Sequence, residues 1–208
     1  ETNMNNTNKP WYRKKFTKDK NSNEFSSFRT NPPGNSNHNL DQESYVSDDL
    51  TKILFLSKRG MSRSPLAREM MRSLLEGTQL FGRVCCASRG VSQAYDQCPI
   101  DARMSKFSSK LGYFLQGFSR FVTIPDLASA DIIVTLDHES EEFVQAHQSY
   151  VRGISQPIGI YFAQGSLPYV QDPYERGEDV DDHYDEIVSS IEYGCSKLFA
   201  QLPSLIAL

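Results

Sequence analysis

Short apolar runs alternate along the chain with stretches in which apolar residues recur every three or four positions. The clearest runs, at 51–56 and 131–136, are typical of buried strands, and the clearest helical pattern spans 180–202. Weaker signals predict strands at 83–88 and 158–160, a short strand or extended turn at 121–123, and helices at 65–75, 99–111, 125–130 and 139–147. This alternation predicts an α/β fold with a parallel sheet and helices on both of its faces.

The first 48 residues are predicted to be a tail outside a domain of residues 49–208. Residues 1–39 hold seven basic and three acidic side chains, a net charge of +4, and include ten asparagines, whereas the remaining chain carries −8. Such a segment buries too little apolar surface to fold alone, and one interpretation is a solvated, unstructured tail. The spaced aromatic residues lead us to predict instead that the tail runs extended and docks on another protein subunit through the anchors Trp11, Tyr12 and Phe16.

Composition excludes several function classes. Hydrophobic residues make up 38% of the chain, and no apolar run approaches the roughly 20 residues of a membrane span, so no transmembrane segment is predicted. A net charge of −4 argues against a nucleic-acid-binding protein. The four cysteines form no CxxC pair and the four histidines are scattered, so the sequence indicates no metal site and no cofactor.

The cysteine usage also favours a reducing intracellular compartment. The sequence begins at Glu1, which is either the mature end after removal of a targeting sequence or simply the first residue given. The expected location is the cytoplasm or, after such removal, an organelle interior of the stroma or matrix kind.

The most informative stretch joins the strand at 51–56 to the helix at 65–75. A loop that enters a helix N-terminus directs unpaired N–H groups and the positive end of the helix dipole toward one point, which forms an anion cradle. Arg63 can close over the anion with a bidentate contact. The alternative is that Ser64 only caps the helix while Arg63 lies in solvent. The candidate phosphate-binding residues are Ser57, Lys58, Arg59, Gly60, Met61, Ser62, Arg63 and Ser64.

The spacing of this loop resembles that of the low-molecular-weight protein tyrosine phosphatase family and its arsenate reductase relatives. Their loop reads Cys, five residues, Arg, Ser or Thr, and often Pro; here Ser57 precedes five residues and then Arg-Ser-Pro at 63–65. An Asp-Pro pair at 172–173, before the last helix, matches the position of the family's general acid. Residues 119–123 and 133–137 resemble the family's middle segments, and the resemblance covers roughly residues 50–202.

The resemblance implies a three-layer fold with a four-stranded parallel sheet flanked by helices. It also implies roles for individual residues: Ser57 stands at the nucleophile position, Arg63 binds the phosphate, and Asp172 protonates the leaving group. Tyr169 and Tyr174 flank the Asp-Pro pair, where aromatic residues of the family wall the phosphotyrosine cleft.

The loop departs from the family at the residues that carry the chemistry. Ser57 replaces the cysteine whose thiolate attacks phosphorus; a hydroxyl ionises far less readily, and the loop offers no histidine as a base. Ser62 replaces a second cysteine, and Lys-Arg-Gly at 58–60 replaces a centre such as Leu-Gly-Asn. If the bend requires glycine at Arg59, the loop is strained or reshaped. These changes predict lost catalysis with anion binding retained.

Three functions remain open. The favoured one is a catalytically inactive phosphatase-like protein that serves, through its tail, as an interaction or structural subunit of a larger assembly. The second is a module that binds phosphotyrosine or another phosphate ester, which Arg63 favours. The third is an active protein tyrosine phosphatase whose nucleophile was changed to serine, which Asp172 alone favours.

Overall fold

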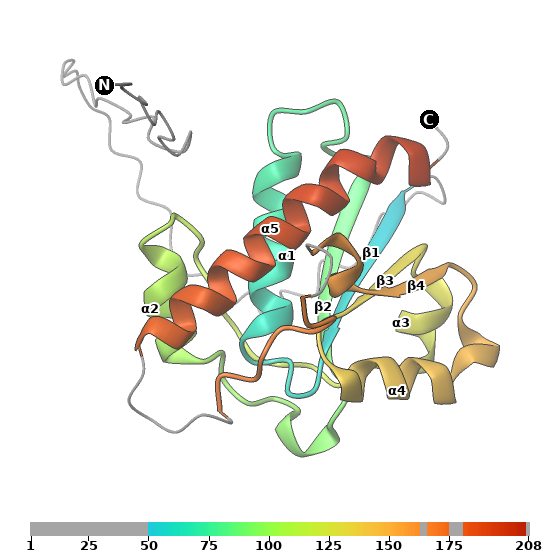
Figure 1. The fold of residues 1–208 in the computed structure, drawn as a ribbon. Helices are drawn as coiled ribbons and strands as arrows, with labels where there is room; N and C mark the ends of the chain where they lie inside the picture. Colours follow the sequence, from blue (N-terminus) through green and yellow to red (C-terminus); the bar gives the residue numbers. More distant parts are fainter. Residues whose placement is uncertain (1–49, 163–165, 175–180, 207–208) are drawn as a thin grey trace, which may run out of the picture. The chain divides into compact units, whose positions relative to one another are not determined.

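The computed structural model describes residues 50–162, 166–174 and 181–206. The predicted tail, with Trp11, Tyr12 and Phe16, lies outside the described residues. In the described part, four strands form one parallel sheet in the order β2-β1-β3-β4 (Figure 1). The first strand is therefore central, and the expected four-stranded parallel sheet is confirmed.

The elements alternate along the chain as the pattern predicts. The strands are β1 (Thr51–Ser57), β2 (Val84–Gly90), β3 (Ile132–Thr135) and β4 (Ile154–Pro157). The α-helices are α1 (Arg63–Leu75), α2 (Ala102–Ser109), α3 (Ile124–Ser129), α4 (His138–Ala146) and α5 (Asp181–Leu205). Short 3₁₀ helices lie in the connections: η1 (Gln93–Tyr95), η2 (Gln148–Tyr150) and η3 (Ile158–Tyr161).

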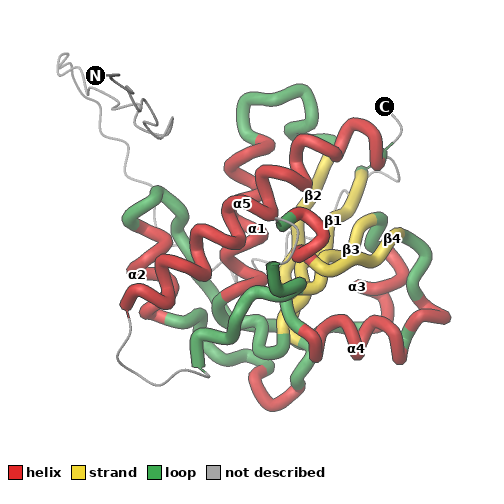
Figure 2. The backbone as a smooth tube through the Cα atoms, in the orientation of Figure 1, coloured by secondary structure: helices red, strands yellow, loops and turns green. Residues whose placement is uncertain are grey.

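Helices cover both faces of the sheet, which gives the fold three layers (Figures 1 and 2). Helices α1, α2 and α5 share one hydrophobic core with Ile53 and Phe55, whereas α3 and α4 share the other with Leu54 and Leu56. Alternate residues of β1 thus enter opposite cores, and all four are at most 3% exposed. A strand covered on both faces has no polar side, which is why the sequence of β1 contains a continuous run of apolar residues.

The last strand lies earlier than the sequence pattern predicts. The expectation of a strand at 158–160 is wrong, because β4 spans Ile154–Pro157 and the next residues form η3. As an edge strand with exposed or half-buried side chains, β4 carries no apolar run. Ile158 is buried against α5 instead, where a Cβ added to Gly194 would come within 2.7 Å of the isoleucine side chain.

Other boundaries differ by a few residues. Helix α1 begins two residues before Pro65, α2 is shorter than the predicted 99–111, and α5 continues three residues past Leu202. Phe121 forms an isolated bridge to Gly90 rather than a strand of its own. Hydrophobic periodicity locates the centre of an element better than its ends, because ends depend on capping and neighbouring loops.

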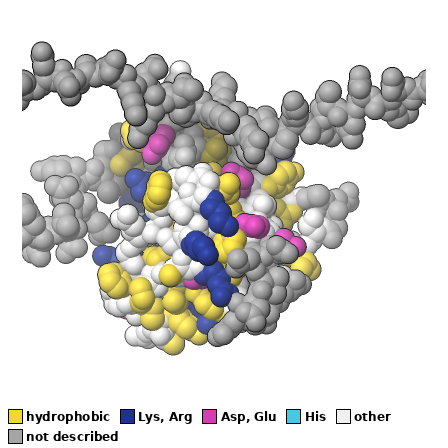
Figure 3. All heavy atoms as spheres, turned by 90° about the vertical axis from the view of Figure 1, so that its left-hand side faces the viewer, with side chains coloured by type: hydrophobic (Ala, Val, Ile, Leu, Met, Phe, Trp, Pro, Cys, Tyr) yellow, Lys and Arg dark blue, Asp and Glu magenta, His cyan; other side chains and the backbone are white. Residues whose placement is uncertain are grey.

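The side of the domain that carries α2 displays Lys and Arg side chains beside a hydrophobic area (Figure 3). Lys106 and Lys110 are exposed at and just beyond the end of α2, and the following loop exposes Phe114 and Phe118. Asp and Glu side chains lie on the same face as these basic and apolar ones (Figure 3). No helix in the described ranges has both the length and the hydropathy to cross a membrane.

Candidate functional site

The loop between β1 and α1 lies at the carboxyl edge of the sheet, where open α/β folds bind ligands. Ser57 ends β1, Arg63 begins α1, and both are 2% exposed. The loop bends at Gly60, whose φ is +69°, and a Cβ there would lie 2.6 Å from the backbone nitrogen of Gly90. Only glycine fits between the loop and the end of β2. The positive φ belongs to Gly60 and not to Arg59, so the condition under which the sequence predicts a strained loop is not met.

Two serine hydroxyls form a chain at the base of the loop. The Ser64 hydroxyl donates to the Arg89 carbonyl at 3.1 Å, and the Ser57 and Ser64 oxygens are 2.9 Å apart. Because Ser64 gives its single proton to Arg89, Ser57 is the donor in the second bond. The Ser57 oxygen in turn accepts the Gly60 N–H at 3.3 Å. Ser64 therefore does not act as a helix cap, and no histidine or carboxylate among the described residues receives the Ser57 proton.

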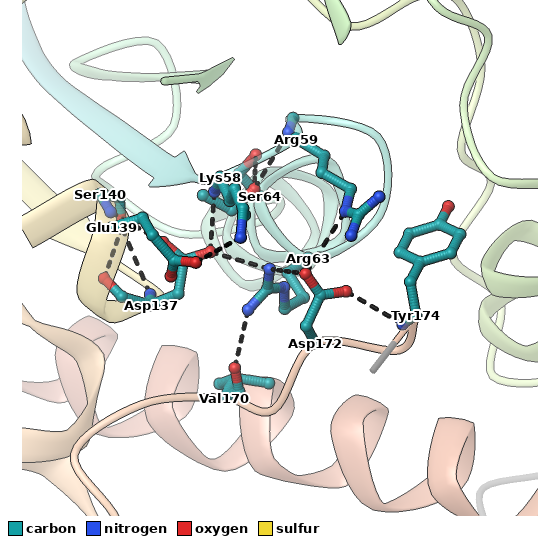
Figure 4. Close-up of polar contacts among 12 residues, drawn as sticks. Lys58, Arg59, Arg63, Ser64, Asp137, Glu139, Ser140, Val170, Asp172 and Tyr174 are labelled. Atoms are coloured by element: carbon teal, nitrogen blue, oxygen red, sulfur yellow. Dashed lines mark hydrogen bonds and ion pairs between the residues drawn. The ribbon is translucent and has the colours of Figure 1, made fainter. Parts of the chain in front are cut away.

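Arg63 is buried in ion pairs rather than exposed to solvent. Its Nη2 lies 2.8 Å from Asp137 Oδ2 and 3.2 Å from Asp172 Oδ2, and its Nη1 donates to the Val170 carbonyl at 2.8 Å (Figure 4). The Arg63 Nε is buried and has no hydrogen-bond partner among the described residues. One buried donor of the guanidinium is thus left for a ligand.

Asp137 is a site residue to which the sequence assigned no role. It caps α4 by accepting the Ser140 N–H at 2.9 Å, and its other oxygen accepts the Lys58 N–H at 2.7 Å besides pairing with Arg63. The local signal was an Asp directly after a buried strand, three residues before a serine, which forms a capping box. That signal identifies the cap but not its second contact with the loop.

Asp172, far along the chain, lies against the same loop. It is 4% exposed, its Oδ1 accepts the Tyr174 N–H at 3.0 Å, and its Oδ2 contacts Arg63 and Arg59. The structure thus brings Ser57, Arg63 and Asp172 into one site. Both carboxylate oxygens of Asp172 already accept hydrogen bonds inside the protein.

The Lys58 side chain points away from the loop centre, toward α4. Its Nζ lies 2.5 Å from Glu139 Oε1. This hydrogen bond raises the pKa of Lys58 and lowers the pKa of Glu139. The Lys58 charge is therefore committed to Glu139, which leaves Arg59 and Arg63 as the other two basic side chains of the loop.

Arg59 lies between two tyrosine rings, one of which the sequence did not indicate. Its Cζ is 4.6 Å from the ring centroid of Tyr174 and 4.8 Å from that of Tyr95, the last residue of η1. Tyr174 is thus beside the loop, as the resemblance implies. Tyr169 is placed differently, because its hydroxyl donates to Glu141 on α4 at 2.5 Å. Met61 contributes its carbonyl, which accepts the Asp101 N–H, and Ser62 is the N-cap residue of α1.

None of the chain's four cysteines lies in the loop. Burial raises the pKa of Cys86 to about 12 and also raises that of Cys195, which is fully buried on α5. Burial likewise raises the pKa of Cys85. These three thiols are therefore protonated at neutral pH, which removes their nucleophilicity.

Comparison with known proteins connects this geometry to a family. The family model described as low molecular weight phosphotyrosine protein phosphatase matches residues 52–205. The protein slr0328 of Synechocystis sp., named for the low molecular weight protein-tyrosine-phosphatases, is 27% identical over 154 residues, covering 73% of this chain and 96% of its own.

Solved structures also share the fold. A protein tyrosine phosphatase from Entamoeba histolytica with Hepes in the active site superposes with a TM-score of 0.67 at 22% identity, over 74% of this chain and 97% of its own. A cysteine-to-serine mutant of the YwlE arginine phosphatase, a Bacillus subtilis protein, is described with a phosphorylated active site serine and gives a TM-score of 0.61 at 22% identity. That match covers 73% of this chain and 95% of YwlE, and at this identity both structures bear on the fold alone.

Proposed function

This chain belongs to the low molecular weight phosphotyrosine protein phosphatase family, and on that premise we propose that its β1–α1 loop binds a phosphate group without hydrolysing the ester. The observation that carries the proposal is the environment of Ser57. This serine stands at the family's nucleophile position by spacing, and its hydroxyl proton is donated to another hydroxyl, which is not a base strong enough to remove it. The protein is then an inactive member of a family of enzymes.

The binding half of the proposal rests on Arg63. A buried guanidinium nitrogen without a partner is rare in folded proteins and is explained if a phosphate oxygen accepts its hydrogen bond. The adjacent helix N-terminus favours a negative charge at the same point. An incoming phosphate competes with Asp172, which already occupies one edge of the guanidinium at 3.2 Å. We therefore expect binding to be reversible and weaker than in a site without an internal carboxylate.

Calorimetric titration with inorganic phosphate tests this function. We expect the wild type to bind, and Arg63→Lys to bind at least about tenfold more weakly, because a lysine cannot present the planar, bidentate donor set. Arg72→Lys is the matched control, because Arg72 lies on the same helix, has a side chain that is 58% exposed and pairs with Glu69. The affinity of this variant for phosphate should equal that of the wild type. No binding by the wild type, or equal affinity in Arg63→Lys, contradicts the proposal.

A second candidate function is suggested by the YwlE mutant, whose active site serine is described as phosphorylated. Under this hypothesis the Ser57 oxygen attacks phosphorus and the ester P–O bond breaks. The leaving alcohol takes the serine proton, and the phosphoserine persists. Intact-mass measurement after incubation with a phosphate ester distinguishes reversible phosphate binding from phosphoryl transfer to Ser57. A phosphoryl adduct on the wild type that is absent in Ser57→Ala favours transfer, and an unmodified chain favours reversible binding.

We further propose, from the sequence alone, that residues 1–48 attach the domain to another subunit. The basic charge and the anchors Trp11, Tyr12 and Phe16 support this role. Deleting the segment should abolish co-purification with the partner and leave the domain's unfolding midpoint unchanged. Co-purification that persists after the deletion contradicts the attachment role.

A further inference from the structure

Arg59 fills a slot that borders the phosphate loop. The Tyr95 and Tyr174 rings lie on either side of its guanidinium, with centroids 4.8 Å and 4.6 Å from Cζ. Its Nη1 also donates to the Tyr95 hydroxyl at 3.0 Å, and its side chain is 23% exposed. The Arg59 guanidinium therefore has both a cation–π partner on each ring and a hydroxyl acceptor, all supplied by the same chain.

The same guanidinium fixes one wall of the slot. Its Nε lies 3.4 Å from Asp172 Oδ2, and the opposite oxygen of this carboxylate accepts the Tyr174 N–H at 3.0 Å. The Tyr174 hydroxyl at the far end of the ring contacts the Asp101 carboxylate through a side-chain hydrogen bond, and burial followed by this carboxylate raises the pKa of the hydroxyl. Arg59, Asp172 and Tyr174 are thus joined by contacts with one another, and the Arg59 guanidinium occupies the position against both rings.

We propose that Arg59 is a built-in occupant of the Tyr95–Tyr174 slot, which removes any preference of the loop for aromatic over non-aromatic phosphate esters or inorganic phosphate. The inference rests on the proposed phosphate binding and names its ligand class. An aryl phosphate at the loop has to place its ring where the guanidinium lies. Stacking of this ring on the tyrosines would replace cation–π contacts of similar strength. It would also require Arg59 to leave its contacts with Asp172 and Tyr95, so the aromatic ring adds nothing to the affinity.

The test compares the affinities of phenyl phosphate and inorganic phosphate in each variant. In the wild type we expect the two to agree within about threefold, whereas Arg59→Ala, with the slot open, should favour phenyl phosphate by about tenfold through ring stacking. Lys58→Ala is the matched control, because it removes the neighbouring positive charge of the loop, which pairs with Glu139 outside the slot. The ratio of the two affinities should stay unchanged in this variant. Arg59→Lys, which keeps the charge without a flat group, should give an intermediate ratio.

A wild type that already favours phenyl phosphate tenfold, or an unchanged ratio in Arg59→Ala, overturns the inference. If neither anion binds any variant, the proposed function fails, and phenol alone then decides the inference. Phenol should shift the Tyr95 and Tyr174 ring resonances in Arg59→Ala but not in the wild type. Equal shifts in the two proteins, or none in either, overturn it.

Discussion

Ser57→Cys combined with Arg59→Ala is expected to hydrolyse 4-nitrophenyl phosphate, whereas the wild type should be no faster than Ser57→Ala. The double change supplies a thiol at the end of β1, where the Gly60 N–H lies 3.3 Å from the residue's Oγ, and opens the slot for the aryl group. A thiol ionises readily near a helix N-terminus, whereas a hydroxyl does not. We expect a gain on the order of 10²-fold or more over the wild type, well below the roughly 10⁶-fold that loss of the nucleophile costs a complete active site.

Ser62→Cys in the same Arg59→Ala background is the matched control for this gain. It places a thiol in the same loop, at the N-cap of α1 rather than at the end of β1, and should remain inactive. Nitrophenol release measured over hours, with intact mass to detect a phosphocysteine, provides the readout. Wild-type turnover that disappears in Ser57→Ala would show that the hydroxyl is catalytic, and equal rates in the Ser57 and Ser62 variants would show that position within the loop is irrelevant.

Arg63→Ala is expected to lower the free energy of unfolding by about 3–5 kcal/mol, the cost of breaking a buried ion pair by removing one partner. Asp137 and Asp172 are each 4% exposed, and both would lose their contact with the guanidinium. The Val170 carbonyl would also lose its donor. Urea unfolding followed by circular dichroism measures the loss.

Arg72→Ala is the control for this destabilisation, because its exposed pair with Glu69 predicts a loss below about 1 kcal/mol. A second comparison isolates the charge effect. Asp137→Asn and Asp172→Asn introduced together into Arg63→Ala should recover part of the stability, since neutral amides cost less to bury than unpaired carboxylates. A loss of less than about 1 kcal/mol in Arg63→Ala would mean that the buried charges are stabilised by other groups.

The sequence by itself determined the features that depend on local pattern. The apolar run at 51–56 predicted a buried strand, and the alternation of strands and helices predicted that helices cover both of its faces, as they do for β1. The spacing from Ser57 to Arg63 predicted a loop around one point at a helix N-terminus, because backbone geometry there directs the N–H groups. The Asp-Pro pair at 172–173 was likewise readable, since motif residues keep their spacing and identity in the chain.

Only the tertiary structure decided where the side chains of that loop point. Arg59 could extend into solvent in any isolated loop; Tyr95 from η1 and Tyr174 from the segment before α5 meet around it only when the domain has folded. Arg63 likewise pairs with Asp137 and Asp172 because β3 ends, and the 170–174 segment passes, beside α1. The edge strand β4 escaped prediction for a related reason: its place is set by pairing to β3, not by burial of its own residues. Local pattern encodes backbone form and burial, whereas the partners of a charged side chain depend on long-range packing.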